Sequence, residues 1–298
     1  MPTFINVVTQ GLTYAVELGL IVLSFSLTYR AIGFINFAHV QFATFGAAFA
    51  LELAYRTPLW FAILGAMILV GILAMLVDLV IFRRVRNASL AAKMIISAGL
   101  GLLMEAAVQF LWGVEPRIFP IGQSGTTIDG ASVQYMSIAT VVIGVVVVLG
   151  FRELMARSKI GWLIRAAADD PDLLQARGAN GARLVTGVWF LSGALAALGG
   201  ALLGVESDVG PLLGQSILIP MFAAAVLGGM GSAAGAIVGA VVLSFSQAIL
   251  FAVNYGFLVG SPSAYLPAGY QVAFEFLVLL VFLSFRPTGL IRTLAERL

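Results

Sequence analysis

Nine long apolar runs divide this chain, and they constrain its fold more than any other feature. The hydrocarbon core of a bilayer is about 30 Å thick, which about 20 helical residues cross. Several runs reach that length and few alternate apolar with polar residues, so helices are expected rather than barrel strands. We predict an all-α polytopic membrane protein with eight to nine transmembrane helices in a single transmembrane domain, residues 1–298. The runs are 4–29, 34–54, 58–82, 89–112, 136–155, 184–205, 216–230, 233–253 and 269–286.

Composition excludes the main soluble classes. The chain is 61% hydrophobic and 10% charged, whereas soluble domains carry about 45–50% apolar and about 25% charged residues. A soluble enzyme, a disordered tail and a nucleic-acid-binding module are therefore excluded. The chain has no Cys and one His, so neither a thiolate nor a multi-His metal site is expected, and we predict no catalytic residues.

Charge placement predicts the orientation. Short loops rich in Lys and Arg stay in the cytoplasm. The cationic clusters lie at residues 83–86, 152–183 and 286–297. The loops with one or no cation are 113–135, 206–215 and 254–268. With nine crossings, the N-terminus is expected outside and the C-terminus in the cytoplasm; with eight, residues 216–230 would fold back as a re-entrant segment.

The first 29 residues contain no Lys or Arg. A secretory signal begins with a basic segment, so the first apolar run is expected to be a retained span.

The loop at 156–182 is too long for a simple turn and is rich in charge. Asp170 followed by Pro is a helix start, and Gly178 after Arg177 is a helix stop. A short cytoplasmic helix of about seven residues is therefore predicted. Its apolar residues, Leu173 and Leu174, either pack back onto the bundle or fill a groove on a partner protein.

Three polar residues stand at the start of an otherwise apolar span, namely Asn36, His39 and Gln41. Asn36 and His39 are three residues apart, so they are expected on one helix face. Polar groups in a membrane face the bundle or a water-filled cavity, which makes these three residues candidates for the substrate pathway. The alternative is an interfacial cap with one satisfied core histidine.

A glycine-rich segment interrupts the apolar sequence between residues 228 and 235. Glycine permits a broken helix or close contact between helices, and broken helices line substrate sites in transporters. The candidate pathway residues in this segment are Gly228, Gly229, Gly231 and Ser232. A tight turn between two helices is the alternative.

Two acidic residues, Glu17 and Glu105, fall within spans without a neighbouring cation in sequence. Intramembrane charges are functional candidates, although a paired structural group is the alternative for both. Asp78 lies close to the cluster at 83–86, and local pairing suffices to explain it. The sequence lacks G-x-x-x-x-G-K-[ST], so any ATP that drives transport binds another chain.

Four segments together resemble the LivH-type branched-chain amino acid ABC transporter permeases. They follow that family's order from residue 33 to residue 291, so the resemblance covers nearly the whole chain. Val40 departs from the pattern, since the family has Gly after the histidine. The segments are GFINFAHVQFATFGA, RAAADDPDLLQARGAN, FAAAVLGGMGSAAGAIVGA and FRPTGLI.

The resemblance implies a permease half of an importer in a bacterial inner membrane, built as an inverted repeat. Spans one to four and six to nine would form the two halves. Implied partners are a homologous LivM-like permease, two cytoplasmic ABC ATPases that hold ATP and Mg, and an external substrate-binding protein. The loop helix becomes an ATPase-coupling helix that ends at Gly178, with Leu173 and Leu174 as its docking face. Its polar rim consists of Asp169, Asp170 and Arg177.

The substrate stays open at this stage. Branched-chain or other apolar amino acids are expected, while urea, short amides and aromatic or alicyclic acids are alternatives within the same family. A stand-alone channel or ion-coupled carrier, with Glu17 or Glu105 as its proton site, is the alternative from another class.

Overall fold

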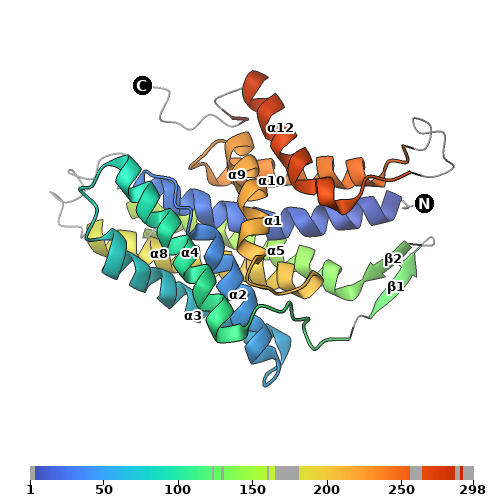
Figure 1. Ribbon diagram of the computed structural model, residues 1–298, viewed down its shortest axis with the longest axis horizontal. Coiled ribbons are helices and arrows are strands. Elements are labelled where there is room, and N and C mark those ends of the chain that lie inside the picture. Colours follow the sequence, from blue (N-terminus) through green and yellow to red (C-terminus); the bar gives the residue numbers. More distant parts are fainter. Residues whose placement is uncertain are drawn as a thin grey trace.

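The computed structural model describes residues 4–122, 124–128, 131–159, 161–164, 181–255, 264–285 and 289–290. Within them the chain is a bundle of helices with one small β-hairpin (Figure 1). The elements are α1 (Phe4–Ile32), α2 (His39–Ala54), α3 (Leu59–Val77), η1 (Asp78–Phe82), α4 (Leu90–Trp112), β1 (Gly125–Ile128), β2 (Ala131–Gln134), α5 (Tyr135–Arg157), α8 (Gly181–Glu206), α9 (Leu213–Gly228), α10 (Ala233–Ala252), η2 (Ala268–Tyr270) and α12 (Gln271–Phe285).

The long helices of these residues coincide with the apolar runs, which confirms a helical, polytopic organisation. Six of them are long and apolar enough to cross a membrane: α1, α3 continued by η1, α4, α5, α8 and α10. The shorter α9 and α12 are also apolar, and α2 has 16 residues. The number of crossings therefore stays a prediction.

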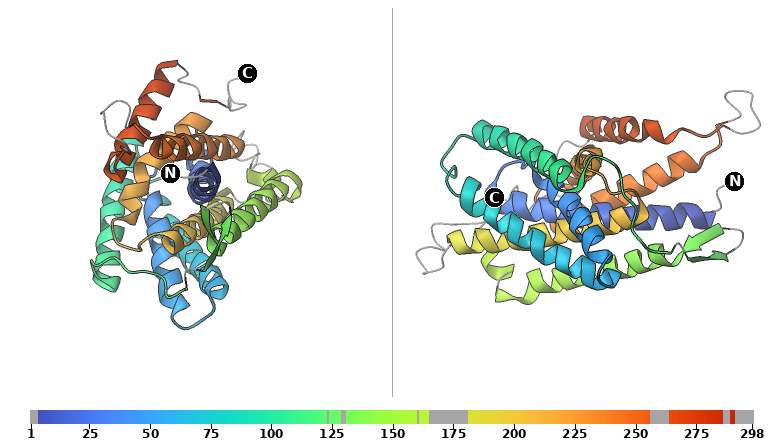
Figure 2. Two further views of the ribbon diagram at one scale, coloured as in Figure 1. Left: turned by 90° about the vertical axis from the view of Figure 1, so that its right-hand side faces the viewer. Right: turned by 60° about the horizontal axis from the view of Figure 1, so that its bottom comes forward.

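Helices α1 and α8 form the centre of the bundle. In the most apolar 18-residue segment of each helix, 83% of the residues are buried in α1 and 78% in α8. The corresponding share is 17% in α5, which lies at the periphery. The end-on view in Figure 2 shows α1 surrounded by other helices. Small residues allow α8 to lie close to its neighbours. A side chain at Gly200 would overlap the carbonyl oxygen of Ala43 in α2, and one at Gly193 would lie 2.8 Å from that of Val70 in α3.

Replacing Gly200 by Val is expected to separate α2 from α8. Overpacking of this kind lowers the free energy of unfolding by about 1–3 kcal/mol, and here the obstacle is backbone, which yields little. The measurement is the thermal unfolding midpoint of the detergent-purified chain. Gly187→Ala is the control, because a methyl group there meets no atom within 4 Å. Equal midpoints for the two variants would contradict the close packing.

The hairpin corrects the expectation of an all-α chain. Strands β1 and β2 pair antiparallel, with Thr126 opposite Val133. Thr, Ile and Val favour strands, and the Asp129-Gly130 pair in the sequence is a hairpin signal. The sequence analysis assigned this region only to a loop. The hairpin precedes α5 at the end of the bundle where α1 begins (Figure 2).

The predicted coupling residues lie outside the described residues. Of the 156–182 loop, the structure describes only 156–159, 161–164 and 181–182. The roles assigned to Asp169, Asp170, Leu173, Leu174, Arg177 and Gly178 therefore stay predictions.

Candidate functional site

His39 is packed in the core between α1 and α2. Its Nε2 lies 2.8 Å from the hydroxyl of Ser24, and its ring makes edge contacts with Phe25 and Phe42. The Ser24 hydroxyl donates to the carbonyl of Ile21 at 2.7 Å, so the imidazole is the donor in the bond to Ser24. This places the proton of a neutral ring on Nε2. The buried Nδ1 is an acceptor without a partner among the described atoms.

Hydroxyl groups extend this contact to α8. Thr28 and Ser192 are hydrogen-bonded through their hydroxyls, and Ser192 also donates to the carbonyl of Ser24 at 2.8 Å. The three helices are thus joined by buried polar groups close to His39. This arrangement gives His39 a structural role in addition to any part in the pathway.

The expectation that Asn36 and His39 share a helix face is wrong. Helix α2 begins at His39, and Asn36 lies in the turn before it. The Asn36 Oδ1 accepts the backbone N–H of Ala38 at 3.1 Å. Asparagine forms this local bond readily in place of helical structure, which explains why the helix starts later than the apolar run.

Gln41 faces the start of α9. A side chain at Gly214 would lie 2.9 Å from the Oε1 of Gln41 and 2.6 Å from the hydroxyl of Thr44. Gln41 and Thr44 are both buried, and these two oxygens lack hydrogen-bond partners within the described part of the chain. Gln41 therefore keeps an unsatisfied polar atom at the contact between α2 and α9.

The glycine-rich segment forms a turn between α9 and α10. Gly229 and Gly231 have φ values of 102° and 81°, a region that glycine adopts without strain. Ser232 caps α10 by accepting the N–H of Gly235 at 3.0 Å. The backbones of Gly228 and Gly235 lie too close together for a side chain at either position. The geometry matches the tight-turn alternative, and a pathway role for this segment stays a prediction.

The two intramembrane glutamates have different surroundings. Glu105 on α4 accepts the side-chain N–H groups of Gln215 at 2.6 Å and of Gln109 at 3.5 Å. Glu17 on α1 is 2% exposed, and its Oε1 has no hydrogen-bond partner among the described residues. Glu105 therefore has the environment of a paired structural group, and Glu17 does not.

Glu17 belongs to a polar stripe that the sequence analysis overlooked. Residues spaced by three or four lie on one helix face, and the stripe faces a cavity of about 340 Å³. The lining is completed by Tyr14 of α1, Gln134 of β2, Ser137 of α5 and Glu206 of α8. The spacing alone could have revealed this face. The stripe consists of Asn6, Thr9, Gln10, Thr13 and Glu17.

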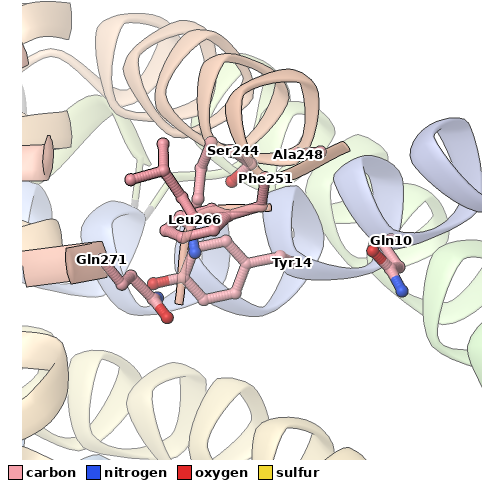
Figure 3. A pocket seen from close by; sticks show the side chains of 8 residues that line it. Gln10, Tyr14, Ser244, Ala248, Phe251, Leu266 and Gln271 are labelled. Atoms are coloured by element: carbon pink, nitrogen blue, oxygen red, sulfur yellow. The ribbon is translucent and has the colours of Figure 1, made fainter. Parts of the chain in front are cut away.

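Tyr14 also borders a second cavity, of about 270 Å³, between α1, α10 and α12. Figure 3 shows its ring beneath Ser244, Phe251 and Leu266, with Gln271 of α12 close to its hydroxyl end. Gln271 donates to the buried Glu275 at 3.2 Å. The part of α1 nearest its N-terminus is thus flanked by two polar cavities.

Asp78 is buried at the opposite end of the bundle. Its Oδ2 accepts the hydroxyl of Thr186 on α8 at 2.7 Å, and its Oδ1 lies 3.7 Å from the guanidinium of Arg86. The predicted pairing with the 83–86 cluster is confirmed. The contact with Thr186 could not be read from the sequence, because the two residues are 108 positions apart.

No group of three or more metal-binding side chains gathers in the part of the chain that the structure describes. The buried polar side chains described above are hydroxyl, amide, imidazole and acidic groups. These side chains can form hydrogen bonds with a polar solute that crosses the membrane.

Comparison with known proteins places these features in a family context. Residues 7–283 match the family described as branched-chain amino acid transport system / permease component. The branched-chain amino acid permease protein LivH of Salmonella typhimurium is 28% identical, with 96% of this chain and 93% of LivH covered. BraD of Pseudomonas aeruginosa, another such permease protein, is also 28% identical, with 96% and 94% covered.

A solved structure shares the fold. PsaBC from Streptococcus pneumoniae in complex with Fab superposes with a TM-score of 0.51 at 14% identity, covering 95% of this chain and 93% of that chain. At this identity the similarity concerns the arrangement of helices alone.

Proposed function

This chain belongs to the family of branched-chain amino acid transport permeases, and we propose that it forms the membrane pathway by which an ABC importer carries branched-chain or other apolar amino acids. It is a transport subunit and not an enzyme. The observation that carries the proposal is the family match over residues 7–283. Relatives described as branched-chain amino acid permeases align over 96% of the chain, so the likeness involves the whole permease.

The proposed assembly contains a homologous LivM-like permease, two cytoplasmic ABC ATPases and an external substrate-binding protein. The sequence lacks a nucleotide-binding P-loop, so ATP and Mg would bind the ATPases. Closure of the ATPases on ATP would move the coupling helices and switch the pathway between outward-facing and inward-facing states. This chain would supply the gated conduit in a bacterial inner membrane.

We propose that the cationic end of the bundle faces the cytoplasm. Arg83, Arg84 and Arg86 follow η1, Arg157 ends α5, and Arg183 opens α8. These helix ends lie on one side of the molecule, whereas the hairpin and the start of α1 lie on the other (Figure 2). By the positive-inside rule, we propose the N-terminus outside and, from the cations at 286–297 in the sequence, the C-terminus in the cytoplasm.

An inverted repeat is supported by how the helices pack. Helices α1 to α4 would correspond to α8, α9, α10 and α12. The α1 helix packs most extensively on α10, and α8 packs most extensively on α3, which are equivalent pairs under this correspondence. Helices α1 and α8 also run in opposite directions (Figure 2), as halves with inverted topology require.

The test is uptake of radiolabelled leucine by proteoliposomes that contain this permease with its partner permease, ATPases and binding protein. We expect accumulation that requires ATP and the binding protein. Leucine uptake without ATP would instead indicate the channel or ion-coupled carrier. ATP-driven uptake of urea, a short amide or an aromatic acid, with leucine excluded, would replace the substrate and keep the importer.

A further inference from the structure

The polar stripe of α1 lines a cavity that becomes more enclosed toward Glu17. We call this the α1 cavity, defined by the stripe together with Tyr14, Gln134, Ser137 and Glu206. Gln10 is exposed at the mouth, Thr13 is 6% exposed, and Glu17 at the floor is 2% exposed. The cavity therefore leads from the end of the bundle where α1 begins to the middle of that helix.

The floor of the α1 cavity is an unsatisfied hydrogen-bond acceptor. The Oε1 of Glu17 is buried without a donor in the described part of the chain, and the hydroxyl of Thr13 is likewise without a partner. A buried carboxylate without donors is costly. Asp78 and Glu275 also have one buried oxygen without a hydrogen-bond partner among the described residues. They differ from Glu17 because each of them, like Glu105, accepts a side-chain hydrogen bond through its other oxygen.

The ionisable side chains of the lining, apart from Tyr14, are acidic. Glu206 stands at the rim, where its Oε1 accepts the hydroxyl of Ser137 at 2.9 Å. The residues that line the cavity include two glutamates, Glu17 and Glu206, and no Lys or Arg. A solute that carries a positive group is therefore favoured at both the rim and the floor, and a solute with negative charge alone is disfavoured.

We propose that the α1 cavity receives the ammonium group of the transported amino acid, with Glu17 as its acceptor. An ammonium group has three N–H donors and no acceptor. The Glu17 carboxylate and the Thr13 hydroxyl supply complementary oxygens, and Glu206 attracts the positive group at the mouth. This proposal rests on the proposed function, because it identifies which part of an amino acid the permease recognises.

A thiol introduced at Thr13 tests the cavity without relying on transport. This chain has no Cys, so Thr13→Cys gives it a single thiol, and the importer with unmodified Thr13 provides the background labelling of the partner chains. In the complete importer, we expect a quaternary-ammonium methanethiosulfonate to modify this thiol at least tenfold faster than a neutral methanethiosulfonate. Adding Glu17→Gln should remove most of that preference, and Glu206→Gln should reduce it. Equal rates for the two reagents at Thr13→Cys would overturn the proposal.

Protection experiments separate an ammonium group from an inorganic cation. Methylammonium is expected to slow modification of the Thr13→Cys thiol, while potassium ions at the same concentration leave the rate unchanged. Equal protection by potassium would show a general cation site and contradict recognition of ammonium. The Glu17→Gln variant should lose protection by methylammonium.

Leucine uptake provides the second readout. Glu17→Gln is expected to lower ATP-driven uptake at least tenfold, whereas Glu153→Gln, which neutralises an exposed carboxylate at the end of α5, should change it less than twofold. Normal uptake by Glu17→Gln in a working importer would overturn the inference and leave the proposed function intact.

No leucine uptake by the unmodified importer would contradict the proposed function itself. If Glu17→Gln fails to fold, the labelling assay is repeated with Glu206→Gln in the Thr13→Cys background. A reduced preference for the cationic reagent supports the proposal, and an unchanged preference contradicts it.

Discussion

Replacing Leu174 by Asp is expected to abolish ATP-driven leucine uptake while leaving the permease folded. Leu174 lies in the short helix predicted within the 156–182 loop, where the family resemblance implies contact with an ATPase. A charge in an apolar docking groove must be desolvated without a partner, which costs several kcal/mol. The measurement is uptake by proteoliposomes that contain the full importer. Co-purification of the ATPase should fall in parallel.

The control for Leu174→Asp is Gln175→Asp, which adds the same charge to the neighbouring polar position. Uptake by this control is expected to stay within about twofold of the unmodified importer, since the predicted docking face consists of Leu173 and Leu174, and substitutions outside such features usually have small effects. Normal uptake by Leu174→Asp would remove the coupling assignment. Loss of uptake in both variants would show that any added negative charge in the loop is harmful, and would contradict a specific docking face.

Replacing Asp78 by Ala is expected to reduce uptake at least tenfold and to destabilise the permease. Asp78 connects η1 to α8 through Thr186, and α8 begins at Gly181, at the end of the predicted coupling loop. Hydrogen bonds to charged groups contribute about 1.5–3 kcal/mol each. Loss of this bond should loosen the start of α8, so that movement of the loop is transmitted poorly. The measurements are leucine uptake and substrate-stimulated ATP hydrolysis by the same importer.

Two further variants separate the contribution of the Asp78–Arg86 ion pair to uptake from that of the Asp78–Thr186 hydrogen bond. Asp78→Asn retains an oxygen that can accept the Thr186 hydroxyl but removes the ion pair with Arg86, whose side chain is 38% exposed. Because partly exposed ion pairs contribute little, Asp78→Asn should keep most of the uptake. Thr186→Val should resemble Asp78→Ala. An Asp78→Asn variant as impaired as Asp78→Ala would assign the effect to charge rather than to the bond with α8.

The positions of the helices were determined by the sequence alone. In a bilayer, backbone N–H and C=O groups must be satisfied within the segment, so a long apolar run forms a helix whatever its neighbours. The apolar runs therefore coincide with the described helices. The same reasoning missed the hairpin of β1 and β2, where short strands depend on pairing with each other. It also placed Asn36 inside a helix, because it ignored the local bond that asparagine makes to the backbone.

The roles of the buried polar residues were decided only by the tertiary structure. Glu17 and Glu105 look alike in sequence, each a single acid within an apolar span. Packing brings Gln215 of α9 to Glu105, 110 residues away along the chain. Glu17 instead lines a cavity that Glu206 of α8 also lines. The spacing of polar residues along a helix determines which of its faces is polar. The side chain that contacts this face comes from another helix, which the spacing does not identify. Whether a buried acid is satisfied or free to bind therefore depends on how distant helices pack.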